Sequence, residues 1–162
     1  MIIGLSLENF TVLHVVISLV AIASGLVVLV GMLRANRLPG WTALFLVTTI
    51  LTSVTGFMFP ISGFTPGIGV GAISLVVLAV ALMAIYAKGL NGTWRWIYVV
   101  TALVALYLNV FVLIVQSFQK VAVLRALAPT QSEPPFLVAQ VAALVVFLIL
   151  GAIATRKFRP AL

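Results

Sequence analysis

Few side chains in this 162-residue chain could carry chemistry, and His14 is the only histidine among them. Near the start of an apolar stretch, a histidine could move a proton, ligate a metal or donate a hydrogen bond to a backbone carbonyl. A metal site needs several ligands close together, and His14 has no second histidine, no cysteine and no acid three or four residues away. We therefore expect no metal site and no bound cofactor, and a hydrogen bond to a carbonyl as the simplest role.

Amide and hydroxyl side chains recur at helical spacing in the later apolar stretches. One face of residues 96–118 carries a stripe at spacings of three and four: Thr101, Ala105, Asn109, Val112 and Gln116. Gln140 lies soon after the start of the last stretch, and Thr52 and Thr55 belong to a hydroxyl-rich stretch upstream. A polar group in hydrocarbon is costly unless it is hydrogen-bonded. These side chains, with His14, therefore either bridge neighbouring helices or line a pocket that opens to one side.

The segment from residue 119 to 133 is more polar and could cover such a pocket. The charged and amide side chains that could form such a cover are Lys120, Arg125, Gln131 and Glu133 of this segment, together with Glu8 near the N-terminus. The first half is apolar enough to continue as a helix until Pro129 ends it. Ser132 is the predicted N-cap of the next helix, because Glu133 and two prolines then fill a first turn whose N–H groups lack helical partners anyway. The candidates either serve only this local structure or form a lid or docking surface.

The composition decides the broad class of protein. The chain is 64% hydrophobic and 7% charged, with nine Lys and Arg, two acids and no cysteine. Soluble domains are about 45–50% apolar and about 25% charged, so there is too little charged surface to cover a soluble globule. This excludes a soluble enzyme, a disordered segment and a disulfide scaffold. The basic residues are scattered, which also excludes a nucleic-acid partner, and we infer an integral membrane protein whose first partners are lipids.

Five stretches are long and apolar enough to cross a membrane, which takes about 20 residues for about 30 Å of hydrocarbon. They cover residues 10–33, 41–60, 68–87, 96–118 and 134–155, with an outer loop over 119–133. The sequence therefore predicts one all-α membrane domain, a bundle of five transmembrane helices. Residues 21–23 resemble a signal-peptide cleavage site, but no basic residue precedes them and the apolar run continues beyond, which favours a retained first helix.

The distribution of Lys and Arg predicts the orientation. Seven of the nine fall on one side of the predicted membrane: Arg34, Arg37, Lys88, Arg95, Arg156, Lys157 and Arg159. Only Lys120 and Arg125 fall on the other side. Cytoplasmic loops carry the positive excess, so we expect the C-terminus in the cytoplasm and the N-terminus outside, in a bacterial inner membrane. The polar candidates then gather toward the outer half.

Small residues mark the places where membrane helices approach closely. Gly25 is such a position in the first stretch, and Gly67 and Gly71 have G-x-x-x-G spacing in the third. They indicate either ordinary packing inside the bundle or the face of a homodimer.

The remaining patterns favour a non-enzymatic function. The sequence has no Gly-rich phosphate loop, no paired carboxylates and no nucleophile with a nearby base. We expect a small polytopic protein that binds a partner subunit, a lipid or a small hydrophobic ligand through its outer face. The alternative is a small-solute transporter or channel, working as a monomer or a dimer, lined by the stripe on residues 101–116. An enzyme acting on a lipid or quinone, with His14 and Glu133 as proton carriers, is a third hypothesis.

Overall fold

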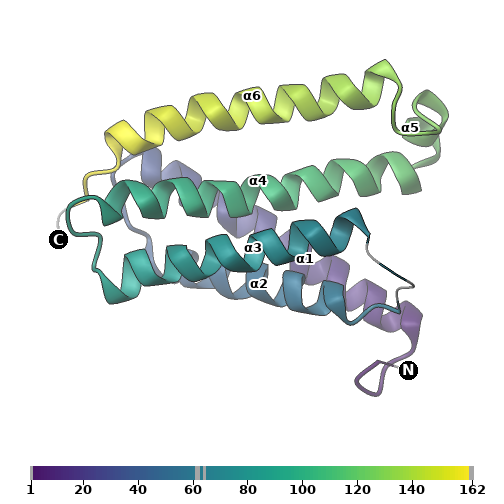
Figure 1. Cartoon of the computed structure of the whole chain (residues 1–162), viewed down its shortest axis with the longest axis horizontal. Helices are drawn as coiled ribbons and strands as arrows, with labels where there is room; N and C mark the ends of the chain where they lie inside the picture. Colours follow the sequence, from purple (N-terminus) through teal and green to yellow (C-terminus); the bar gives the residue numbers. More distant parts are fainter. Residues whose placement is uncertain (1, 61–62, 64, 161–162) are drawn as a thin grey trace.

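A computed structural model describes residues 2–60, 63 and 65–160, and long helices dominate it (Figure 1). These helices are α1 (Leu7–Leu33), α2 (Pro39–Phe57), α3 (Pro66–Leu82), α4 (Trp94–Lys120) and α6 (Pro134–Lys157). A π-helical turn, η1 (Met83–Ala87), continues α3, and the six-residue α5 (Ala122–Leu127) follows α4. Five helices, counting α3 with η1 as one, are long and apolar enough to span a membrane. The predicted all-α five-helix membrane bundle is confirmed.

Local sequence accounts for where the helices begin. The Ser6 side chain caps α1 by accepting from the Asn9 N–H at 3.2 Å, and Thr65 caps α3 in the same way. Proline stands in the first turn of α2, α3 and α6, where a missing N–H breaks no helical hydrogen bond. With η1 counted as the end of α3, the observed helices begin and end within three residues of the predicted spans.

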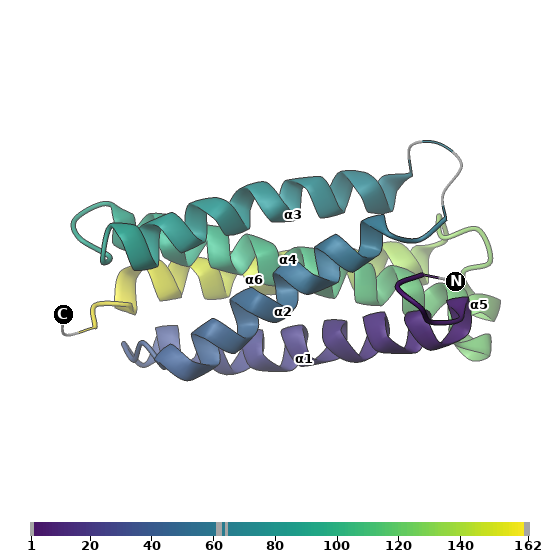
Figure 2. The same cartoon turned by 90° about the horizontal axis from the view of Figure 1, so that it is seen from below.

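The helices differ in how much of their surface is covered. α1 packs mainly on α2, α3 on α4, and α6 runs along α4 at one edge of the bundle (Figures 1 and 2). In the most apolar 18 residues of each helix, 44% are buried in α1 but only 6% in α6. α6 therefore presents most of its apolar side chains to its surroundings, as a lipid-facing helix does, while Phe147 and Leu150 pack against the core.

Close packing inside the bundle depends on small residues. A Cβ added at Gly25 would lie 2.5 Å from Leu106 Cδ1 and 2.9 Å from the Phe45 ring. Gly71 faces the Phe57 ring, which would lie 3.1 Å from an added Cβ. Gly25 and Gly71 are thus packing positions within one chain, whereas among the described residues an added Cβ at Gly67 would have only the Thr65 hydroxyl within 4 Å, at 3.7 Å.

The two termini lie at opposite ends of the bundle (Figure 1), as five crossings require. We call the end with the C-terminal tail, the α1–α2 turn and the α3–α4 turn the inner end. It carries seven of the nine Lys and Arg residues. The outer end carries α5, both acids and the other two cations. This charge asymmetry predicts that the inner end faces the cytoplasm.

Candidate ligand-binding site at the outer end

α5 and the turn after it form a polar segment beside the outer ends of α4 and α6 (Figure 1). α4 ends at Lys120, and extended backbone at Val121 (φ −85°, ψ 116°) starts the turn into α5. None of the α5 residues is buried, and Val123 and Leu127 are 71% and 53% exposed. Apolar side chains and the exposed Arg125 therefore share one short helix, which is the composition of a segment lying in a membrane interface.

Two aromatic side chains join α4 to α6 on either side of this segment. Phe118, near the end of α4, is buried and packs edge-on against Phe136 in the first turns of α6, with ring centroids 5.4 Å apart. Edge-to-face pairs at this distance are favourable beyond their buried area. We did not predict this contact. Its signal in the sequence is one aromatic residue on each side of the polar segment.

The turn before α6 is closed by the carboxylate of Glu133. Glu133 Oε1 accepts from the Thr130 hydroxyl at 2.8 Å and from the Thr130 N–H at 3.1 Å, and Oε2 accepts from the Ser132 N–H at 3.1 Å. Partial desolvation raises the pKa of Glu133, but these hydrogen bonds outweigh it, so the pKa lies below its ordinary value. The predicted N-cap is wrong by one residue: Glu133, not Ser132, is the N-cap, because its backbone is extended (φ −77°, ψ 156°) and the helix begins at Pro134.

Gln131 ties the same turn to α4. Its Nε2 donates to the backbone carbonyl of Val115 at 2.9 Å, and its Oε1 accepts from Gln119 Nε2 at 3.3 Å. Its backbone is left-handed (φ +59°), a conformation that is uncommon outside glycine. The side-chain bonds hold the residue in this conformation, so the turn has a defined position relative to α4.

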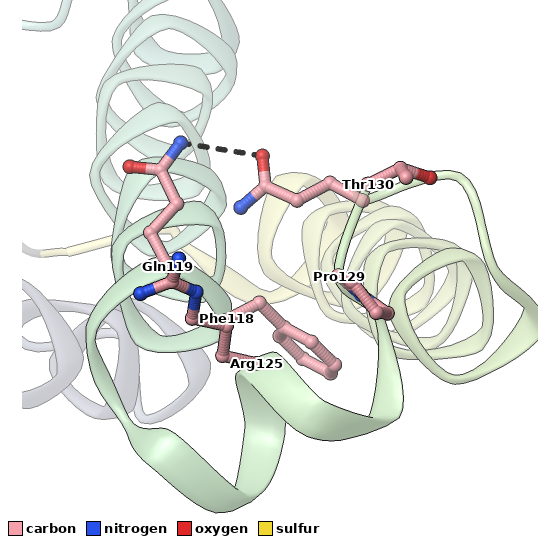
Figure 3. Close-up of a pocket in the computed structure, with 6 residues that line it drawn as sticks. Phe118, Gln119, Arg125, Pro129 and Thr130 are labelled. Carbon is pink, nitrogen blue, oxygen red and sulfur yellow. Dashed lines mark hydrogen bonds between the residues drawn. The ribbon is translucent and has the colours of Figure 1, made fainter.

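An open pocket of about 340 Å³ lies between the end of α4, α5 and this turn. Its lining residues are Phe118, Gln119, Arg125, Pro129, Thr130 and Gln131. Figure 3 shows Gln119 extending from the α4 side, joined by its hydrogen bond to the amide from the turn, with Pro129 and Thr130 on the opposite wall. The Arg125 guanidinium makes no hydrogen bond within the described residues. The pocket therefore offers a cation and amide groups beside an aromatic ring.

His14 lies elsewhere, between α1 and α2, with Nδ1 2.7 Å from the Thr55 hydroxyl. That hydroxyl also donates to the Leu51 carbonyl at 2.7 Å. With a proton on Nδ1, His14 donates to Thr55 and both bonds form, whereas the other tautomer would make Thr55 choose between two acceptors. The geometry favours the Nδ1–H tautomer. The predicted bond from His14 to a carbonyl is wrong, because a threonine hydroxyl on α2 takes its place.

Two amides predicted as pocket candidates bridge helices. Asn109 Nδ2 donates to the Thr49 hydroxyl at 3.3 Å, which joins α4 to α2. Gln140 Nε2 donates to the Phe111 carbonyl at 3.3 Å, which joins α6 to α4. Gln140 Oε1 is buried and has no hydrogen-bond partner among the described residues. Of the two alternatives that the sequence left open, the bridging one describes these contacts.

The other predicted residues contribute little to either arrangement. Thr52 donates to the Thr48 carbonyl of its own helix at 2.9 Å, and Gln116 is exposed. Glu8 and Lys120 are exposed at the outer end. Of all the predicted candidates, Arg125 and Gln131 line the pocket, and Glu133 shapes its wall.

The described residues contain no group of three or more His, Cys, Asp or Glu that could hold a metal ion. No model of a known protein family matches the chain, and no similar curated protein or solved structure was found. The function must therefore be argued from the site itself.

Proposed function

We propose that this protein is a non-enzymatic membrane protein that binds the phosphate of a phospholipid headgroup in its outer pocket. The observation that carries the proposal is the place of Arg125, which lines an open polar pocket on a helix with exposed apolar side chains. A guanidinium recognises phosphate through two parallel hydrogen bonds. A short amphipathic helix lies at the depth of the headgroups, so the Arg125 guanidinium and the lipid phosphate would lie at the same depth in the membrane.

The location that we propose is the bacterial inner membrane, with the pocket on the periplasmic side. The seven positive residues at the inner end support this orientation. The rigid turn supports the assignment of the pocket, because the bonds made by Gln131 and Glu133 fix one wall before any ligand arrives. A preformed site loses less conformational entropy on binding than a mobile one.

The other functions that the sequence predicted have less support. A transport route needs polar groups that continue to the inner end, and the hydroxyls of Thr42 and Thr101 there donate to backbone carbonyls. A catalytic pair of His14 and Glu133 would have to share a substrate. His14 contacts Thr55 between α1 and α2, whereas Glu133 closes the turn before α6.

Lipid titration of the purified full chain, followed by native mass spectrometry, tests the proposal. The probe is phosphatidylglycerol, and the variants are Arg125→Gln and, as a matched control, Lys120→Gln. Both variants remove one positive charge from the outer end, but Lys120 does not line the pocket. A hydrogen bond to a charged group contributes about 1.5–3 kcal/mol, so we expect Arg125→Gln to weaken lipid binding about tenfold or more, and Lys120→Gln to change it little.

Equal losses in the two variants would refute the proposal, because general attraction to the surface charge would then explain the binding. A second refuting result is a protein that co-purifies in fixed stoichiometry, is lost in Arg125→Gln, and leaves lipid retention unchanged. The pocket would then be a docking site for a partner subunit.

A further inference from the structure

A second pocket, of about 360 Å³, lies at the inner end. It is lined by Leu90, Gly92, Arg95, Arg159 and Pro160. These residues come from the turn between η1 and α4, from the first turn of α4 and from the tail after α6. Figure 1 shows that tail turning from the end of α6 toward the α3–α4 turn. The pocket thus joins segments that are far apart in the sequence.

Arg95 is held in place on this pocket by the end of α6. Its Nη1 donates to the Phe158 carbonyl at 2.6 Å and to the Thr155 carbonyl at 3.4 Å. The last carbonyls of a helix have no helical partner, so Arg95 caps them. Only one guanidinium nitrogen is used, and Nη2 and Nε make no hydrogen bond within the described residues. Arg159 is exposed, and its side chain likewise makes none there.

The charge at this pocket has no balancing side chain nearby. The chain has only two acids, Glu8 and Glu133, and both lie at the outer end. Glu133 precedes the 24 residues of α6, so about 36 Å separates it from the tail, several times the Debye length of about 8 Å at physiological salt. Within the described residues 2–60, 63 and 65–160, the only negative charge at this end is the partial charge of about −0.5 at the C-terminus of α6, against two guanidinium groups.

We propose that the inner pocket binds the phosphate of an anionic glycerophospholipid in the inner leaflet, with Arg95 as the cation held by the end of α6 and Arg159 as the exposed one. The pocket lies where α4 begins and α6 ends, at the membrane boundary, and Trp94 and Trp96 occupy the same level. Basic pockets between transmembrane helices on the cytoplasmic side suit anionic headgroups. Apolar walls from Leu90 and Pro160 suit a glycerol backbone better than a hydrated ion. This site is separate from the outer pocket in place and in residues.

Tryptophan fluorescence reports on this end alone, because the three tryptophans, Trp41, Trp94 and Trp96, all lie in the first turns of α2 and α4. The experiment titrates phosphatidylglycerol with brominated acyl chains into the full chain in phosphatidylcholine nanodiscs and measures quenching. The variant is Arg159→Gln, which keeps the helix cap made by Arg95. The matched control is Arg34→Gln, an exposed positive residue at the same end outside the pocket. We expect Arg159→Gln to bind about tenfold more weakly or worse, because it loses a charge-assisted hydrogen bond to the phosphate, and the control to lose clearly less, because it removes only general attraction to the anionic surface.

Three results would overturn the inference. Equal weakening by Arg159→Gln and Arg34→Gln would mean general surface attraction. Quenching that is no stronger with brominated phosphatidylglycerol than with brominated phosphatidylcholine would mean no anionic selectivity. Loss of the quenching on addition of inorganic phosphate would assign the pocket to a soluble anion. Arg125→Gln should leave the quenching unchanged, so failure here and failure of the outer-pocket proposal are separate outcomes.

Discussion

Gly25→Ala is the sharpest structural test of the bundle. An alanine Cβ would lie 2.5 Å from Leu106 Cδ1 and 2.9 Å from two atoms of the Phe45 ring. Leu106 and Phe45 are both only 1% exposed, so neither side chain can move away from the new Cβ without displacing its own neighbours. Overpacking of a tight core costs about 1–3 kcal/mol. We expect Gly25→Ala to lower the free energy of unfolding by an amount in that range, relative to its control.

The control is Gly151→Ala, because a Cβ there would lie 3.6 Å from Leu103 Cδ1, an ordinary contact. Both glycines are interior positions of long helices, so the gain in helix propensity, about 1 kcal/mol, is common to the two variants and cancels in the comparison. The assay is reversible unfolding by sodium dodecyl sulfate in mixed micelles, followed by circular dichroism. Equal unfolding free energies for the two variants would refute the packing of α1 against α2 and α4 described above.

Two further predictions concern the outer end. A double-mutant cycle of His14→Phe and Thr55→Val, measured by the same unfolding assay, should give a favourable coupling of about 0.6 kcal/mol and at most about 1.7; zero coupling would contradict the His14–Thr55 hydrogen bond. Glu133 has a folded-state pKa below its ordinary value of 4.5, so its stabilisation of the turn is present above pH 4.5 and is lost as the pH falls through the lowered value. An NMR titration of its carboxyl carbon should therefore have a midpoint below 4.5, with the Thr130 amide shifting in step, and a midpoint above 4.5 would contradict the carboxylate-closed turn.

Much of the fold could be predicted because hydropathy and helix-ending residues act locally. The polar segment was harder. Its first half was expected to continue as a helix, and α5 is that helix, but the N-cap of α6 fell one residue later than expected. A sequence pattern ranks Ser132 above Glu133 as a cap. In the structure the Glu133 carboxylate reaches back to Thr130, and the helix begins only at Pro134, which leaves the serine outside it.

The candidate site, too, could be predicted from the sequence only in part. The residue types were predictable, since amides and cations near membrane ends are few, and Arg125, Gln131 and Glu133 were all named from the sequence. Their assembly into one pocket was not, because Gln131 bonds the Val115 carbonyl 16 residues away and the Phe118–Phe136 contact crosses the whole segment. A carbonyl acceptor leaves no mark in the sequence, because every residue carries one.

The sequence by itself therefore determined the class of protein, the five spans and the expected orientation. Length, hydropathy and the positions of Lys and Arg are properties of each segment, and the bilayer acts on each segment separately. The tertiary structure decided which polar groups meet: His14 with Thr55, 41 residues apart, and Arg95 with Phe158, 63 residues apart. Those pairs depend on the rotation and offset of one helix against another. These follow from side-chain packing over the whole interface, so no local pattern could have named the partners.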